Sequence, residues 1–185
     1  MMSTALLFGQ TKKTVAQDGS GDFTTVQAAI DAVPDGNTKP VIIYIKKGIY
    51  KECITISIAK AFVRFVGEDV TTTKLTFDNY ASKKDSAGKA FGTTGSSSVF
   101  VNGDNISFEN ITFENSSGPV GQAVAVNVIG NRVAFKNCRF LGSRIPCIPR
   151  VQRCSIIKIA TSKVRSILFL VRPLRCLNIV RSIAD

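Results

Sequence analysis

Histidine and tryptophan are both absent from this chain of 185 residues. The lack of histidine excludes Ser-His-Asp and Cys-His catalysis and any metal site built on imidazole. The five cysteines contain no Cys-x-x-Cys pair, so they show neither zinc-finger spacing nor an evident disulfide framework. They are Cys53, Cys138, Cys147, Cys154 and Cys176. These residues therefore predict neither a histidine-based nor a zinc-finger metal site, and no cofactor is expected.

Long apolar runs are also lacking. Ile167–Val171 is too short to cross a bilayer, and Arg172-Pro173 follows it directly, so we expect no membrane association. The opening Met1–Gln10 is similar to the hydrophobic end of a secretory signal without its basic start. Residues 1–14 are thus expected to be a signal-peptide remnant or an ordinary disordered terminus.

Acidic residues become scarce toward the C-terminal end, because after Glu114 the only carboxylate side chain is that of Asp185. The net charge is +11, of which Ser143–Asp185 contributes +8 from nine basic residues and one acidic residue. Met1–Gly142 has 15 basic and 12 acidic residues, a net charge of +3. The excess is concentrated in one segment and no nucleic-acid-binding motif accompanies it, so nucleic acid is not an expected partner.

The chain before Ser143 is organised as one helix followed by short strands. Apolar residues of Val26–Val33 fall on one helical face, Thr24-x-x-Gln27 has the spacing of a capping box, and Pro34-Asp35-Gly36 ends the helix. The polar stretch Tyr80–Ser98 is expected to be a long surface loop. β-branched and aromatic runs predict strands at Val41–Ile45, Cys53–Ile56, Phe62–Val66 and Lys74–Phe77.

An internal repeat follows the loop. The segment Asn105–Phe113 is echoed by Asn131–Phe140, and three of its residues recur 27 positions later. These pairs are Phe108 and Phe135, Asn110 and Asn137, and Phe113 and Phe140. A unit of strands and turns of this length cannot bury its apolar face alone and needs a copy stacked on it, which predicts a solenoid with apolar columns inside and asparagine bridging its corners. A β-sandwich would show turn signals without a fixed repeat, so an all-β parallel β-helix is the better interpretation.

Four segments, in their order along the chain, resemble motifs of the pectin methylesterases (pectinesterases). They are Asp18–Phe23 with the following Val26–Ile30, the G-x-Y-x-E match Gly48–Glu52, the G-P-x-x-x-Q-A-V-A match Gly118–Val126, and Asn137–Gly142. The resemblance covers Val15 to Gly142. It implies a right-handed parallel β-helix with one short N-terminal helix, truncated in this chain, in a protein that is secreted, periplasmic or located in the cell wall.

The resemblance also implies a chemistry. Such enzymes are carbohydrate esterases that hydrolyse the methyl esters of galacturonate units in pectin without a metal. One aspartate attacks the ester carbonyl, a second serves as acid and then base, glutamine amides stabilise the oxyanion, and an arginine orients the nucleophile. Pectin or polygalacturonate is the expected partner, and a monomer is the expected state.

Only part of this machinery carries over by position. The first oxyanion glutamine matches Gln122, for which the simpler alternative is a polar cap on a solenoid turn. A substrate-contacting threonine matches Thr93 when the loop is aligned without gaps, and otherwise Thr93 belongs to a ladder of Ser and Thr in that loop. Gly48, Tyr50 and Glu52 are expected to be structural, holding the first turns together.

Both aspartates and the arginine are missing from the expected positions. After Gly142 the family continues with Q-D-T-L, then D-F-I-F-G and, far downstream, R-P-W, whereas Ser143–Ile148 reads S-R-I-P-C-I. A mechanism with two aspartates cannot operate with these residues, so we expect the chain as written to be inactive.

One lost base near Ser143 explains the replacement. Ser143–Ile148 can be encoded TCC AGG ATA CCC TGT ATA, and stepping the frame back by one base gives F-Q-D-T-L-Y. The same step across Ile157–Val171 permits Q-D-C-Y-I-E-G-T-V-D-F-I-F-G. Ser143–Asp185 is then expected to be an out-of-frame tail without a reliable structure, and a natural basic extension is the rival explanation.

Two other functions stay open. The chain could be a non-catalytic β-helix that binds polygalacturonate, or another pectin-active β-helix enzyme, a lyase or a polygalacturonase. Lyases generally need Ca²⁺-binding carboxylates and a basic residue, and the motif match at Gly118–Val126 points away from them.

Overall fold

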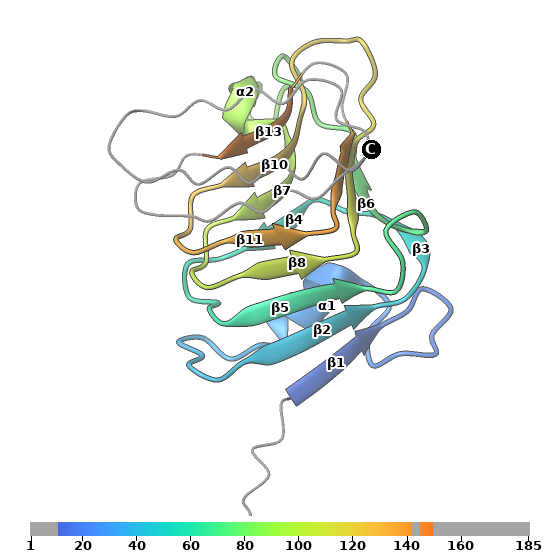
Figure 1. The fold of residues 1–185 in the computed structure, drawn as a ribbon. Coiled ribbons are helices and arrows are strands. Elements are labelled where there is room, and N and C mark those ends of the chain that lie inside the picture. The colour runs from blue at the N-terminus through green and yellow to red at the C-terminus, as the bar shows by residue number, and fades with distance from the viewer. Residues whose placement is uncertain (1–10, 142–144, 150–185) are drawn as a thin grey trace, which may run out of the picture.

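The chain folds into stacked coils of short parallel strands (Figure 1). The structure, a computed structural model, describes residues 11–141 and 145–149. Among these residues, no helix is long and apolar enough to cross a membrane. The helices are α1 (Val26–Asp31) and α2 (Gly92–Gly95). The strands are β1 (Thr11–Val15), β2 (Val41–Ile45), β3 (Gly48–Lys51), β4 (Ile54–Ile56), β5 (Val63–Gly67), β6 (Thr73–Phe77), β7 (Ser97–Val101), β8 (Ser107–Glu109), β9 (Thr112–Asn115), β10 (Val124–Val128), β11 (Ala134–Lys136), β12 (Arg139–Leu141) and β13 (Ile145–Pro149).

Three parallel sheets form the walls of the solenoid. The first sheet has the order β1-β2-β5-β8-β11, the second β3-β6-β9-β12, and the third β4-β7-β10-β13. From β2 onward, each coil adds one strand to each sheet, so sheet neighbours are separated by a whole coil of sequence. The four strands predicted between Val41 and Phe77 correspond to β2, β4, β5 and β6 within one residue at each end. The predicted all-β parallel β-helix is confirmed.

The sequence repeat corresponds to one coil. In the first sheet Phe108 pairs in register with Phe135, and in the second Phe113 pairs with Phe140. The Phe108 ring stacks on those of Phe65 and Phe135, with centroids 4.8 and 5.1 Å apart, and the column is buried. Such offset stacking adds to the free energy gained by burying the rings. The predicted interior apolar columns are confirmed for these phenylalanines.

The corners of the coils need residues that tolerate unusual backbone geometry. Asn110 and Asn137 both have positive φ, 57° and 49°, a left-handed conformation that asparagine adopts more readily than most residues. The Asn137 side-chain amide donates to Asn110 Oδ1 at 2.7 Å, bridging successive coils. At another corner a Cβ on Gly130 would lie 1.9 Å from the carbonyl oxygen of Gly103, so only glycine permits that stacking distance.

The described chain begins inside the segment that was expected to be a signal remnant or disordered. Thr11–Val15 forms β1 and pairs in parallel with β2, so for residues 11–14 the disordered alternative is wrong. Sequence pattern does not reveal this strand, because only Val15 on it is buried and its neighbours are polar. Residues 1–10 lie outside the described residues.

Helix α1 forms where predicted, but its capping differs from the expected box. The N-cap residue is Thr25, whose hydroxyl accepts from the Ala28 amide at 3.3 Å. The amides of Val26 and Gln27 donate to the two carboxylate oxygens of Glu52 at 2.8 and 2.9 Å. A carboxylate at a helix N-terminus satisfies free amide donors and interacts favourably with the helix dipole. The cap therefore comes from a residue distant in sequence, which a local motif cannot indicate.

The polar stretch predicted as one surface loop contains a second helix and ends in buried residues. The one-turn helix α2 lies within it, in addition to the short N-terminal helix that was expected. Ser96, Ser97 and Ser98 have no exposed surface, and β7 begins at Ser97. Each hydroxyl donates to a backbone carbonyl: Ser96 to Thr93, Ser97 to Thr94 and Ser98 to Phe77. Burial is tolerated because these polar groups have partners.

The strand Ile145–Pro149, inside the segment expected to be an out-of-frame tail, continues the third sheet. The backbone of β13 pairs in parallel with β10, with Val124 opposite Ile145. Ser143–Asp185 was expected to form no reliable structure, but Ile145–Pro149 within it forms a strand of the sheet. The rest of that segment lies outside the described residues.

Candidate active site

Gln122 lies at the surface, two residues before β10, a strand whose residues are all buried. Every residue from Ala123 to Val128 is buried, so β10 provides a fixed base for this side chain. The Gln122 side chain is exposed, while its carbonyl accepts a hydrogen bond from the Ala81 amide at 2.8 Å. The residue is therefore anchored through its backbone, and its side chain extends from a fixed position.

The structure brings the two residues expected to contact the substrate together. Thr93, on α2, is 29 residues before Gln122 in sequence, and its hydroxyl donates to Gln122 Oε1 at 2.5 Å. With its oxygen engaged in this way, the amide group of Gln122 has its two N–H donors left. A hydroxyl and an amide fixed on neighbouring elements can bind a carbonyl oxygen or a sugar hydroxyl.

The segment Tyr80–Phe91 forms an ordered flap next to this pair. Lys84 and Ala90 form an antiparallel bridge, and the Gly92 amide donates to the Ala81 carbonyl at 2.9 Å. The Asp85 carboxylate accepts from two amides of its own turn. These bonds connect α2 to Ala81 and, through it, to Gln122.

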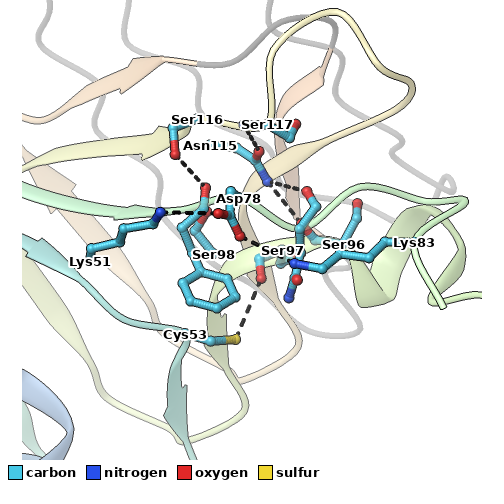
Figure 2. A network of polar contacts seen from close by, with 12 residues as sticks. Lys51, Cys53, Asp78, Lys83, Ser96, Ser97, Ser98, Asn115, Ser116 and Ser117 are labelled. Carbon is cyan, nitrogen blue, oxygen red and sulfur yellow. Dashed lines mark hydrogen bonds and ion pairs between the residues drawn. The ribbon is translucent and has the colours of Figure 1, made fainter. Parts of the chain in front are cut away.

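A buried asparagine links the elements around the site (Figure 2). Asn115 ends β9 and is 3% exposed. Its amide nitrogen donates to the carbonyl oxygens of Asn79, Ser96 and Val124 at 2.9, 2.9 and 3.0 Å. Its Oδ1 accepts from the Ser117 amide at 3.1 Å. Sequence reasoning missed this residue, since an asparagine just before a Ser-Ser-Gly-Pro turn is typical of any loop.

Asp78 is the carboxylate in the network of Figure 2. Lys51 and Lys83 each form an ion pair with it, at 3.1 and 3.2 Å. Hydrogen bonds from Lys51 and then Lys83 hold the pKa of this carboxyl below its ordinary value. A carboxylate that is ionised and paired in this way accepts hydrogen bonds and does not donate a proton near neutral pH.

Cys53 lies in the same network without the properties of a nucleophile. Its Sγ is 3.8 Å from the Ser97 carbonyl oxygen, and burial raises the pKa of its thiol. The reactive thiolate is therefore disfavoured. In residues 11–141 and 145–149, no group of three or more Cys, Asp or Glu side chains is arranged to hold a metal ion.

The G-x-Y-x-E residues make their contacts at the N-terminal end of the solenoid. The Tyr50 hydroxyl is buried and donates to the Lys46 carbonyl at 2.9 Å, while the Gly48 amide donates to Thr72. Glu52 caps α1, as described above. These contacts hold the first coils together and do not involve Thr93 or Gln122.

The three parallel sheets, stacked coil on coil, define the class of protein as a parallel β-helix. A model of the family Pectinesterase matches residues 12–145. The chain is 47% identical to Pectinesterase 31 of Arabidopsis thaliana over 133 residues, and 45% identical to a pectinesterase of Petunia integrifolia over 130. The chain therefore belongs to the pectinesterase family, as its motifs predicted.

Solved structures agree with this assignment. Pectin methylesterase from carrot superposes with a TM-score of 0.62 at 31% identity, over 80% of this chain and 48% of the carrot protein. Pectin methylesterase PemA from Erwinia chrysanthemi, at 24% identity and a TM-score of 0.66, shares the fold over 76% of this chain and 49% of its own. The sequence matches cover 69% and 70% of this chain but only 42% and 33% of the Arabidopsis and Petunia proteins. The chain thus spans less than half the length of these relatives.

Proposed function

We propose that this chain carries the N-terminal coils of a pectin methylesterase, an enzyme that hydrolyses methyl esters of galacturonate units in pectin. The observation that supports this most is the hydrogen bond between Thr93 and Gln122 inside the family match. In ester hydrolysis the carbonyl oxygen gains negative charge as a tetrahedral intermediate forms, and amide donors fixed at that position stabilise it. Gln122 would supply such donors.

We also propose that the polypeptide as written does not perform the hydrolysis. Water must add to the ester carbon and methanol must leave, which in this family's scheme requires a carboxylate nucleophile and a proton donor. Residues 115–184 contain no carboxylate side chain, so the two aspartates of that scheme have no counterpart in this part of the sequence. Methanol release from highly methylated pectin at the level of a blank is the expected result. Release well above the blank by the purified chain would refute the inactivity.

The frame slip near Ser143 is the proposed cause. The restored reading contains Q-D-T-L and D-F-I-F-G, which would supply a second glutamine and both aspartates. Reading the nucleotide sequence past codon 142 in the neighbouring frame tests this. Both motifs are expected there, and their absence from every frame would favour a natural basic extension. We call the product with one base reinserted at this point the frame-restored chain.

Binding without hydrolysis is the second candidate function. Gln122 and Thr93 stand beside the flap, which carries the exposed Lys84 and Lys89, and basic side chains favour an acidic polymer. Two related pectin methylesterase structures were solved with hexasaccharides bound. Retention of this chain on de-esterified pectin beads, without methanol release, is the result that a binding protein predicts. The protein would act as a monomer at the cell wall or in a secreted or periplasmic location, which light scattering and cell fractionation can test.

A further inference from the structure

An exposed glutamine does not by itself present a defined donor. Its carboxamide carries an acceptor oxygen and an NH₂ group that exchange places when the side chain rotates by half a turn. Stabilising an oxyanion requires that the NH₂ group, not the oxygen, face the substrate. Something must therefore select the orientation of the Gln122 amide.

Thr93 provides that selection. Its hydroxyl donates to Gln122 Oε1, the acceptor end of the carboxamide. This contact keeps Oε1 turned toward α2 and leaves Nε2 turned away from it.

Two sets of hydrogen bonds, one through the Asn115 side chain and one through the Ala81 backbone, set the distance between α2 and β10 on which the contact depends. Asn115 donates from one nitrogen to the Ser96 carbonyl, directly after α2, and to the Val124 carbonyl, at the start of β10. Ser96 in turn donates from its hydroxyl to the Thr93 carbonyl at 2.7 Å. On the other side, Ala81 bonds both Gly92 and Gln122 through its backbone.

Both donor hydrogens of the buried Asn115 amide are in use. Its two hydrogens serve three carbonyl acceptors, so one hydrogen is shared, and its oxygen accepts from Ser117. A side chain that is 3% exposed and bonded in this way cannot rotate without leaving buried groups unpaired. It is a rigid connection between the segments that carry Thr93 and Gln122.

We propose that Thr93 is a positioning residue, whose hydroxyl fixes the Gln122 amide with its NH₂ group facing the substrate side, and that Asn115 holds the two backbones at the required distance. The orientation is a property of this chain as it exists. Only its use in oxyanion stabilisation rests on the proposed function.

The test uses the ¹⁵N-labelled full chain in solution. The side-chain NH₂ signals of Gln122 are assigned by their loss in Q122A, and their heteronuclear NOE is measured. In the native chain the NOE should match that of the backbone amides of β10. In T93V, which removes the hydroxyl but keeps the shape, it should fall to the value of a freely rotating side chain, and T93S should restore it. An unchanged NOE in T93V overturns the proposal.

N115D tests the connection, because it keeps the side-chain shape and one acceptor oxygen but removes both donor hydrogens. We expect the Gln122 NOE to fall although Thr93 is intact, while the matched control N137D, at an exposed corner, leaves it unchanged. A native NOE in folded N115D contradicts the role of Asn115. If N115D loses its dispersed spectrum, it is unfolded and N115S, whose smaller side chain keeps a single hydroxyl donor, takes its place in the test of Asn115. The role of Thr93 is then still tested by comparing T93V with T93S.

The frame-restored chain separates this inference from the proposed function. There T93V should lower kcat on methylated pectin by about tenfold with KM nearly unchanged, less than the 10²–10³-fold loss typical of removing an oxyanion donor. T93S should retain activity. If Q122A is as active as the unmodified frame-restored chain, the oxyanion role fails while the NMR result on the amide orientation stands. If T93V keeps full kcat, the orientation has no catalytic use.

Discussion

The aromatic column through the coils offers a quantitative test of the fold. Phe108 is 1% exposed and touches three rings, stacking on Phe65 and Phe135 and meeting Phe113 edge-on at 5.3 Å. Replacing a buried phenylalanine by alanine costs about 3–5 kcal/mol, and three ring neighbours put F108A near the upper end. F108L keeps most of the volume and loses the ring pairs, each of about 0.5–1.5 kcal/mol, so we expect a loss of about 2–3 kcal/mol.

Urea unfolding followed by circular dichroism measures these losses, with F62L as the matched control. Phe62 is 39% exposed, and we expect its replacement to change the free energy of unfolding by less than about 0.5 kcal/mol. A domain stability of only 5–15 kcal/mol makes the F108A loss a large fraction of the total. If F108L costs no more than F62L, the column does not stabilise the coils as argued.

Three further predictions concern single side chains. Glu52 accepts two amides at the N-terminus of α1, so E52A should lower the free energy of unfolding by about 1–2 kcal/mol, and a loss below a few tenths in urea would contradict the cap. Hydrogen bonds from Lys136 and then Arg64 lower the pKa of Glu109 in the folded state, so its ionised form stabilises the fold at neutral pH and this contribution is lost as the pH falls through the acid range. The stability gap between the native chain and E109Q should therefore close on acidification, whereas a gap independent of pH would contradict it. Burial raises the pKa of the Cys138 thiol to about 12, so peptide mapping should find it unalkylated by iodoacetamide until urea unfolds the chain; rapid alkylation in the folded state would disagree.

The sequence predicted those parts of the fold that repeat. The recurrence of Phe108 at Phe135 predicted the length of one coil, because equivalent positions stack in successive coils. Burial of one face of each strand produced the alternation of apolar and polar residues from which the strands were predicted. β1 has no such pattern, because it is the edge strand of its sheet and only its last residue, Val15, is buried. The serines at 96–98 read as loop residues because their burial depends on carbonyl partners that only the folded chain provides.

The site was predictable only where it carried a family motif. Gln122 and Thr93 were found individually, but nothing in their spacing showed that they bond each other. Asn115 and the Asp78 ion pairs were missed, because a buried hydrogen-bond hub and a solvated polar residue look alike in sequence. Long-range polar contacts form only when the coils stack, whereas a sequence pattern indicates only local secondary structure.

Methanol release by the frame-restored chain tests the central claim most directly. Side by side on highly methylated pectin, the restored chain should release methanol, its Q122A variant should be slower by about 10²–10³-fold, and the present polypeptide should match the blank. A correctly folded restored chain that releases no methanol would contradict the account, as would equal release by all three proteins.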